Sequence, residues 1–208
     1  MQATAPKATV TNWFGNIVSH PAVVVEAKSV DDIVAILRNP SDFPGPVRAV
    51  GSNHSTSPCG TADGGTLIKM SKMDAIVDIG GDTVTAQGGA LYIDIAKELE
   101  KHNQQFYVNT EIGSLSAGSA ACCGTKDASM PGEFGQVNSY ISRIKMLLPS
   151  GDRLEITDDQ PELMQQVRSS YGTFGIVYET RFAYGQFYLW PCITRRFNWR
   201  SSRRSSMN

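Results

Sequence analysis

The stretch PVRAVGSNHSTSP, from Pro46 to Pro58, decides how the rest of the chain is interpreted. Residues 47–50 have the composition of a short buried strand, and they run directly into Gly51-Ser52-Asn53-His54-Ser55. These five residues offer several backbone N–H groups with little side-chain bulk. Such nests bind anions, phosphate in particular. A plain turn with an exposed histidine is the alternative that this stretch alone leaves open.

A second stretch rich in small residues, from 113 to 125, strengthens the anion-binding interpretation. Its sequence is GSLSAGSAACCGT, which again offers N–H donors and hydroxyls and lets a backbone approach a ligand closely. Two such stretches fit an elongated diphosphate ligand better than one. Neither is a Walker loop, because no Gly-Lys-Ser/Thr follows, and neither is G-x-G-x-x-G with an acid about 20 residues on. A Rossmann dinucleotide site is therefore not expected.

Composition bounds the class of protein. The 208 residues suffice for one domain or for two small lobes that share a core. The net charge of −1 gives no global field that favours nucleic acid or an acidic membrane. The four cysteines form no C-x-x-C pair and are interpreted as free thiols. With no signal peptide and no apolar run near ~18 residues, we expect a cytoplasmic or other intracellular location and no membrane span.

Periodicity predicts a mixture of hairpins and β-α-β units, and therefore an α+β fold in two small lobes. A strand at 22–26 precedes a helix that begins after Ser29, and its apolar face holds Val30, Ile33, Ile36 and Leu37. A helix at 91–103 should bury Leu91, Ile95 and Leu99. Further strands are expected at 47–50, 66–70, 104–108 and 175–184, hairpins at 75–87 and 141–157, and a helix from Pro161.

Three segments resemble those of the vanillyl-alcohol oxidase and p-cresol methylhydroxylase (PCMH) flavoproteins. VRAVGSNHSTSP resembles their R-x-x-G-x-G-H-S segment. SLSAGSAACCGTK is similar to a second segment, S-x-x-G-x-x-A-T-G-T-H in the aldonolactone and alditol oxidase branch. RSSYGTFGIVYETRFAY resembles a third, G-x-x-G-I-V/I-x-x-x-T. Three segments in order imply a PCMH-type FAD-binding domain over residues 18–185, followed by a tail, 186–208, that is expected to be irregular.

The resemblance assigns roles to matching positions. In many members the histidine of the first segment is bonded to the flavin 8α-methyl group, and His54 matches it; other members only pack this histidine beside FAD. Ile176 and Val177 would contact the cofactor through their backbone, or else belong only to the strand core. The implied cofactor-binding residues are Val50, Gly51, Ser52, Asn53, His54, Ser55, Ser114, Gly118, Gly124, Thr125, Ile176 and Val177.

The chain departs from the family pattern at several positions. Lys126 replaces the usual histidine of the branch, which leaves the substrate class open. Ile112 lies where doubly linked members carry a cysteine, so no second flavin link is expected. Cys122 and Cys123 are expected to be buried small residues, with a thiol–flavin role as the alternative. Cys59 is interpreted as a loop thiol. His20 and His102 are interpreted as surface residues without metal-ligand company.

The resemblance implies an oxidoreductase that takes a hydride from a CH–OH carbon of a small molecule such as a sugar lactone or alditol. In full-length relatives a second domain supplies the substrate pocket, so no catalytic residue is assigned here. The chain ends about where that domain should begin, and its last 23 residues hold five arginines and no acid. A truncated, non-catalytic FAD-binding remnant and a noncovalent FAD reductase of the same fold therefore stay open, as does the oligomeric state.

Overall fold

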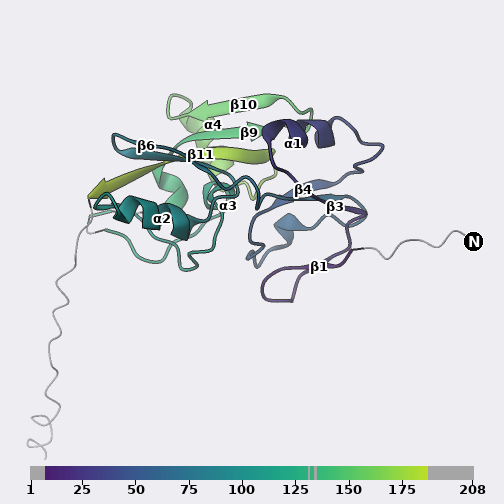
Figure 1. The fold of residues 1–208 in the computed structure, drawn as a ribbon, viewed down its shortest axis with the longest axis horizontal. Coiled ribbons are helices and arrows are strands. Elements are labelled where there is room, and N and C mark those ends of the chain that lie inside the picture. Colours follow the sequence, from purple (N-terminus) through teal and green to yellow (C-terminus); the bar gives the residue numbers. More distant parts are fainter. Residues whose placement is uncertain (1–7, 131, 134, 187–208) are drawn as a thin grey trace, which may run out of the picture.

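The structure, a computed structural model, describes residues 8–130, 132–133 and 135–186. These residues form two lobes that lie side by side (Figure 1). The predicted helices and strands occur in the predicted order, with some further elements between them, and the mixture of helices and sheets confirms the α+β expectation. The tail from residue 187 onward lies outside the described residues. In the described part of the chain, no helix has the length and apolar character needed to cross a membrane.

The smaller lobe contains three parallel strands in the order β3-β5-β4, with helix α1 packed beside them. The strands are β3 (Val23–Glu26), β4 (Val47–Val50) and β5 (Thr66–Lys69), and α1 spans Val30–Leu37. The Ser29 side chain accepts a hydrogen bond from the Asp32 N–H, and Asp32 accepts one from the Ser29 N–H. Such a capping box is typically worth about 1 kcal/mol and fixes where α1 begins.

The larger lobe is built on a six-stranded sheet in the order β10-β9-β11-β7-β6, with β8 pairing beside the end of β11. Its strands are β6 (Ile76–Gly80), β7 (Thr83–Gln87), β8 (Gln104–Phe106), β9 (Ile141–Leu147), β10 (Arg153–Thr157) and β11 (Ile176–Gln186). The hairpins β6–β7 and β9–β10 form at the predicted turns. Its helices are α2 (Tyr92–Glu100), α3 (Ala117–Cys122) and α4 (Pro161–Arg168).

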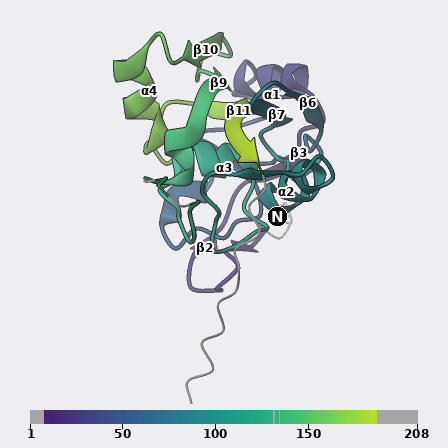
Figure 2. The ribbon, with the colours of Figure 1, turned by 90° about the vertical axis from the view of Figure 1, so that its left-hand side faces the viewer.

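Two details differ from the sequence-based expectation. Leu91 is the N-cap of α2 and is only partly buried, so Tyr92 joins Ile95 and Leu99 on the buried side instead. The second small-residue stretch contains helix α3, which the sequence analysis did not predict. It lies near the middle of the molecule (Figures 1 and 2), and its residues Ala117, Ala120 and Ala121 are fully buried.

Short elements outside the two main sheets were also missed. β1 (Val10–Thr11) and β2 (Val18–Ser19) pair as a small antiparallel hairpin, and single 3-10 turns cover Pro58–Gly60 and Val137–Tyr140. Strands of two residues leave no usable alternation in a sequence. This hairpin is hydrogen-bonded to the loop that follows β4.

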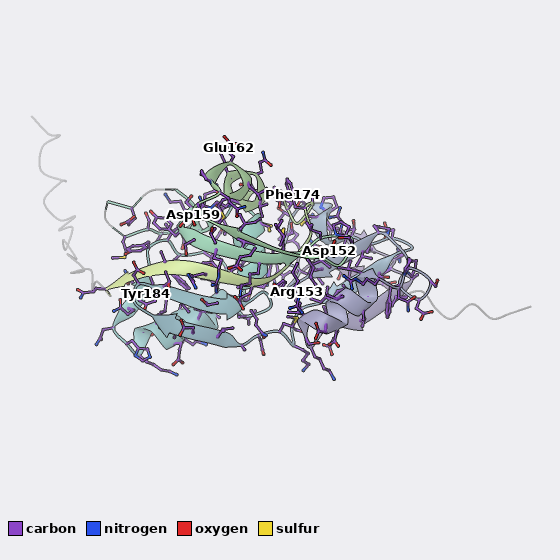
Figure 3. All side chains as sticks on the ribbon, turned by 90° about the horizontal axis from the view of Figure 1, so that it is seen from above. Asp152, Arg153, Asp159, Glu162, Phe174 and Tyr184 are labelled. Carbon is purple, nitrogen blue, oxygen red and sulfur yellow. The ribbon has the colours of Figure 1, made fainter. Side chains whose placement is uncertain are left out.

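The lobes are joined by a shared apolar cluster. Leu147 at the end of β9 and Ile176 at the start of β11 pack with Ile33, Ile68 and Met73 of the smaller lobe. Figure 3 shows Asp152 and Arg153 at the end of the sheet that faces the smaller lobe, while Tyr184 lies at the opposite end.

Two ion pairs cross the same junction. Asp152 pairs with Arg38 at 3.3 Å, and Arg153 pairs with Asp31 at 2.8 Å. All four side chains are mostly exposed, so each pair contributes about 1 kcal/mol or less. The apolar cluster therefore holds the lobes together.

Candidate functional site

A cavity of about 440 Å³ opens where the two lobes meet. A volume in this range is typical of small-molecule and cofactor sites. The smaller lobe contributes β4 and the loop that follows it, and the larger lobe contributes α3, the end of β9 and the start of β11. Of the residues that line the cavity in the described part of the chain, only Arg48 is charged.

The structure brings most of the sequence-predicted site residues to this cavity or to its immediate border. Five of them line it: Val50, Gly51, Gly118, Ile176 and Val177. Ser52, Asn53, His54 and Ser55 continue the loop after β4, and Ser114 contacts that loop. Gly124 and Thr125 lie after α3 and line no part of the cavity; Gly124 is exposed, and the Thr125 carbonyl accepts a hydrogen bond from the Val137 N–H.

The first and second small-residue stretches touch at Gly51 and Ser116. A Cβ built on Gly51 would lie 2.1 Å from Ser116 Oγ and 2.5 Å from Ser116 Cβ. No side chain fits there, so glycine is required by space and not by an unusual backbone angle. Ser116, a buried residue that lines the cavity, was not among the predicted site residues. It lies within the second stretch, but its sequence position alone did not separate it from the neighbouring serines.

Ser114 fixes the position of the loop after β4. Its Oγ lies 2.9 Å from His54 Nε2, and its carbonyl accepts a hydrogen bond from the Ser52 hydroxyl. The other imidazole nitrogen, His54 Nδ1, is buried and has no hydrogen-bond partner within the described residues. When Nε2–H donates to Ser114 Oγ, Nδ1 keeps a free lone pair.

The N-terminal hairpin covers the other side of this loop. The Trp13 ring lies 5.6 Å from the His54 ring, centroid to centroid. The backbone N–H of Trp13 donates to the Asn53 carbonyl at 2.8 Å, and the side-chain amide of Asn53 donates to the Thr11 carbonyl at 2.8 Å. Asn12 also donates to the Ser55 carbonyl at 3.0 Å. The loop is therefore held on two sides, by Ser114 and by the hairpin.

The backbone N–H groups of this loop are its main unused donors. Within the described residues, the N–H groups from Gly51 to Ser55 donate no hydrogen bond, although the carbonyls of Asn53 and Ser55 both accept one. Asn53 has a positive φ of 54°, so the chain reverses its backbone twist in the middle of the loop. Where the sign of φ alternates between neighbouring residues, consecutive backbone N–H groups can point toward one anion, an arrangement called a nest.

The N-terminus of α3 differs from this loop, because its first two N–H groups are already used. The Ala117 N–H donates to the Ala90 carbonyl, and the Gly118 N–H donates to the Gly88 carbonyl, both at 2.8 Å. A Cβ on Gly118 would lie 3.1 Å from that Gly88 oxygen and 3.4 Å from the Val177 carbonyl oxygen. Gly118 thus allows α3 to pack closely on β11 at the base of the cavity, and its N–H is not available to a ligand.

Three thiols lie at the same cavity, and none was predicted to line it. Cys122 is buried as expected, and desolvation raises its pKa to about 11. Cys59 and Cys123 are partly buried, so the expectation of a buried residue is confirmed for Cys122 and wrong for Cys123. The Cys123 thiol lowers the pKa of Cys59 to about 5, with help from the Ser55 and Ser57 hydroxyls, while the pKa of Cys123 rises. His20 and His102 are exposed, as expected.

Comparison with known proteins gives the family of this site. A family model described as an FAD-binding domain matches residues 21–157. L-gulonolactone oxidase from Bos taurus is 25% identical over 169 residues, 80% of this chain and 38% of the relative. L-gulono-1,4-lactone dehydrogenase from Mycobacterium tuberculosis is 23% identical over 169 residues, with the same two coverages of 80% and 38%.

A third relative carries a broader name. The protein called uncharacterized oxidoreductase ORF5 in fasciation locus, from Rhodococcoides fascians, is 27% identical over 166 residues, 79% of this chain and 38% of the relative. The chain thus spans between 31% and 38% of the length of the curated relatives it matches.

The contact between Gly51 and Ser116 predicts a compensating pair of substitutions. Gly51→Ala should destabilise the protein by about 1–3 kcal/mol, because the new methyl group overlaps Ser116 Oγ and forces the two loops apart. Adding Ser116→Gly removes both overlapping atoms and should restore most of the loss. Urea denaturation of the single and double variants measures this. Gly80→Ala is the control, since a Cβ there meets nothing closer than 3.8 Å. A double variant no more stable than Gly51→Ala would contradict the contact.

Proposed function

The chain belongs to the FAD-binding domain family, and we propose that it binds FAD in the cavity between its lobes, with the diphosphate on the loop Gly51–Ser55. The observation that carries this proposal is the row of unused N–H groups in that loop. Hydrogen bonds from backbone N–H groups to a charged phosphate are roughly twice as strong as neutral ones. Gly51 and Ser52 carry too little bulk to block the approach of the ligand.

The remaining residues of the cavity fit this placement. Arg48 supplies a positive charge at the wall formed by β4. Ile176 and Val177 are the first residues of β11, and their backbone would contact the cofactor. Gly118 would contribute close packing and no hydrogen bond, because its N–H is already bonded. Gly124 and Thr125 would approach FAD only beyond the limits of this cavity.

We further propose that His54 forms the covalent link to the flavin through Nδ1. This nitrogen is buried without a partner, which is costly unless something compensates it. Ser114 holds Nε2 at 2.9 Å, which orients the ring and keeps the lone pair on Nδ1. Because Nδ1 is shielded from solvent, the proposal requires the imidazole or its surroundings to shift when FAD enters.

The function that this site supports best is flavin-dependent oxidation of a CH–OH group. FAD, when bound, accepts the hydride, and the residues of this chain bind and orient it. The names of the similar lactone oxidase and lactone dehydrogenase support a sugar lactone or a related alcohol as the substrate class. The chain's own contribution is the cofactor cavity, the loop that holds the diphosphate, and His54.

The covalent link predicts a simple biochemical signature. After incubation with FAD and acid precipitation, visible flavin absorbance should stay with the protein. In His54→Ala it should pass into the supernatant, with at least about a tenfold drop in retained flavin, since a covalent bond is lost and not weakened. His102→Ala, which replaces an exposed histidine, is the matched control. Flavin released equally by the wild type would remove the covalent link and leave FAD binding intact.

The substrate class is tested with the FAD-loaded protein under anaerobic conditions. Addition of an aldono-1,4-lactone or an alditol should bleach the visible flavin bands, because the hydride is transferred and no oxygen returns the cofactor to its oxidised form. Dithionite provides the full extent of reduction. A bound flavin that dithionite reduces, but that no lactone or alditol reduces, would count against oxidation by this chain while leaving its cofactor site standing.

A further inference from the structure

Two large aromatic side chains are exposed side by side in the turn between β1 and β2. Trp13 is 67% exposed and Phe14 is 69% exposed, and their ring centroids lie 5.8 Å apart. Single exposed apolar residues are ordinary on a soluble protein, whereas neighbouring ones can mark a binding surface. Trp13 is also the ring that lies against His54, so this turn joins an exposed aromatic surface to a residue of the candidate site.

The backbone of this turn is braced on the loop after β4. The Trp13 N–H donates to the Asn53 carbonyl at 2.8 Å. The buried Asn12 side chain donates to the Ser55 carbonyl at 3.0 Å and accepts from the Ile17 N–H at 3.0 Å. The position of Trp13 beside the loop is therefore set by backbone and asparagine hydrogen bonds, which a change of the Trp13 side chain leaves in place.

The indole and the imidazole are held in different ways. Trp13 and His54 have ring centroids 5.6 Å apart and planes tilted by 35°, and no other aromatic ring contacts His54 in the part of the chain that the structure describes. Ser114 fixes the imidazole at Nε2, while within the described residues the indole N–H makes no hydrogen bond. A mostly exposed side chain held by ring contacts alone rotates readily. The indole is therefore the part that can shift when a ligand reaches the buried, unpartnered His54 Nδ1.

We propose that Trp13 prepares His54 for the flavin link: its indole covers Nδ1 in the free protein and supports the flavin ring once FAD is bound. The second half of this statement rests on the proposed function. A carbon bonded to Nδ1 lies about 1.45 Å from it, so the linked ring would begin beside the indole. Aromatic rings favour offset or tilted contacts with centroids about 4.5–7 Å apart, the range that Trp13 already keeps to His54.

The cover is tested without FAD, using diethyl pyrocarbonate, which acylates a neutral imidazole nitrogen, and peptide mapping by mass spectrometry. The chain holds three histidines, and His20 and His102 are exposed. His54 should react at least about tenfold more slowly than either, because a buried nitrogen reacts only when the structure opens locally. Trp13→Ala should remove most of this protection. Trp13→Phe, which keeps a ring, and Phe14→Ala, the matched control, should retain it. Unchanged protection of His54 in Trp13→Ala would overturn the cover.

The support of the flavin ring is tested by the rate of link formation, followed by acid precipitation at timed intervals in air-saturated buffer. The new N–C bond replaces a methyl C–H and an imidazole N–H bond, and dissolved oxygen takes the two electrons and two protons as hydrogen peroxide. Trp13→Ala should link at least about tenfold more slowly, because the ring is no longer oriented. Trp13→Phe and Phe14→Ala should link at nearly the wild-type rate.

The two assays are expected to change in opposite directions in Trp13→Ala, with faster acylation of His54 and slower linking to FAD. Linking at or above the wild-type rate would overturn the support of the ring, and only that, as long as the wild type links. A wild type that never links would remove the proposed link and this support together, while the acylation assay still decides the cover.

A spectroscopic signature separates direct contact from a merely structural role. An indole in contact with a flavin quenches its fluorescence by electron transfer, and a phenyl ring does not. The comparison uses the His54→Ala background, in which no imidazole contributes to quenching. There, Trp13→Phe should raise the fluorescence of bound flavin and Phe14→Ala should not. Equal fluorescence with and without the indole would overturn the contact between Trp13 and the flavin ring.

Discussion

The site depends on a contact in which the side chain of one lobe packs so closely on the backbone of the other that only glycine fits there. Gly51 in the loop after β4 meets Ser116 at the start of α3, and these residues come from different lobes. The distance between the lobes is set elsewhere, by the apolar cluster that joins Leu147 and Ile176 to α1. Because cores are packed at the density of organic crystals, that cluster fixes the loop contact within narrow limits.

This contact decides which backbone donors are free for an anion. The Ala117 and Gly118 N–H groups at the start of α3 are bonded to the carbonyls of Ala90 and Gly88, so these two donors are part of the packing. The loop from Gly51 to Ser55 is anchored by its side chains and carbonyls, through Ser52, His54 and the hairpin around Trp13. Its N–H groups are left to a ligand. In the described part of the chain, Arg48 is the only charged residue that lines the cavity, so the backbone N–H groups of the loop would have to contribute much of the binding of a diphosphate.

The sequence predicted the parts of this architecture that carry strong local signals. The N-cap at Ser29, the turn at Gly81 and Pro161 at the start of α4 each fix an element boundary through a local interaction, and each was found where expected. The loop after β4 was recognisable because small residues follow an apolar strand. The three motif segments then gave the family, which the match over residues 21–157 confirms.

The features that were missed depend on tertiary packing. Helix α3 is too short and too rich in small residues to show periodicity, and it is stabilised by burial against β11 and β7. The contact of Ser116 with Gly51, and the place of Cys59 and Cys123 at one cavity, result from how the two lobes are joined. No local pattern states which of several serines or cysteines will meet across a cavity. Gly124 and Thr125 were assigned by resemblance alone, and they lie outside the cavity.

The account's central claim is that the loop Gly51–Ser55 holds the diphosphate of FAD, and amide hydrogen exchange with and without FAD tests it most directly. The unused N–H groups of this loop should exchange quickly in the free protein and at least about tenfold more slowly with saturating FAD, because each becomes a hydrogen-bond donor to phosphate. The turn at Gly80–Asp82, on the far hairpin, should not change. Unaltered exchange at Gly51–Ser55, with FAD bound and protection elsewhere, would contradict the account.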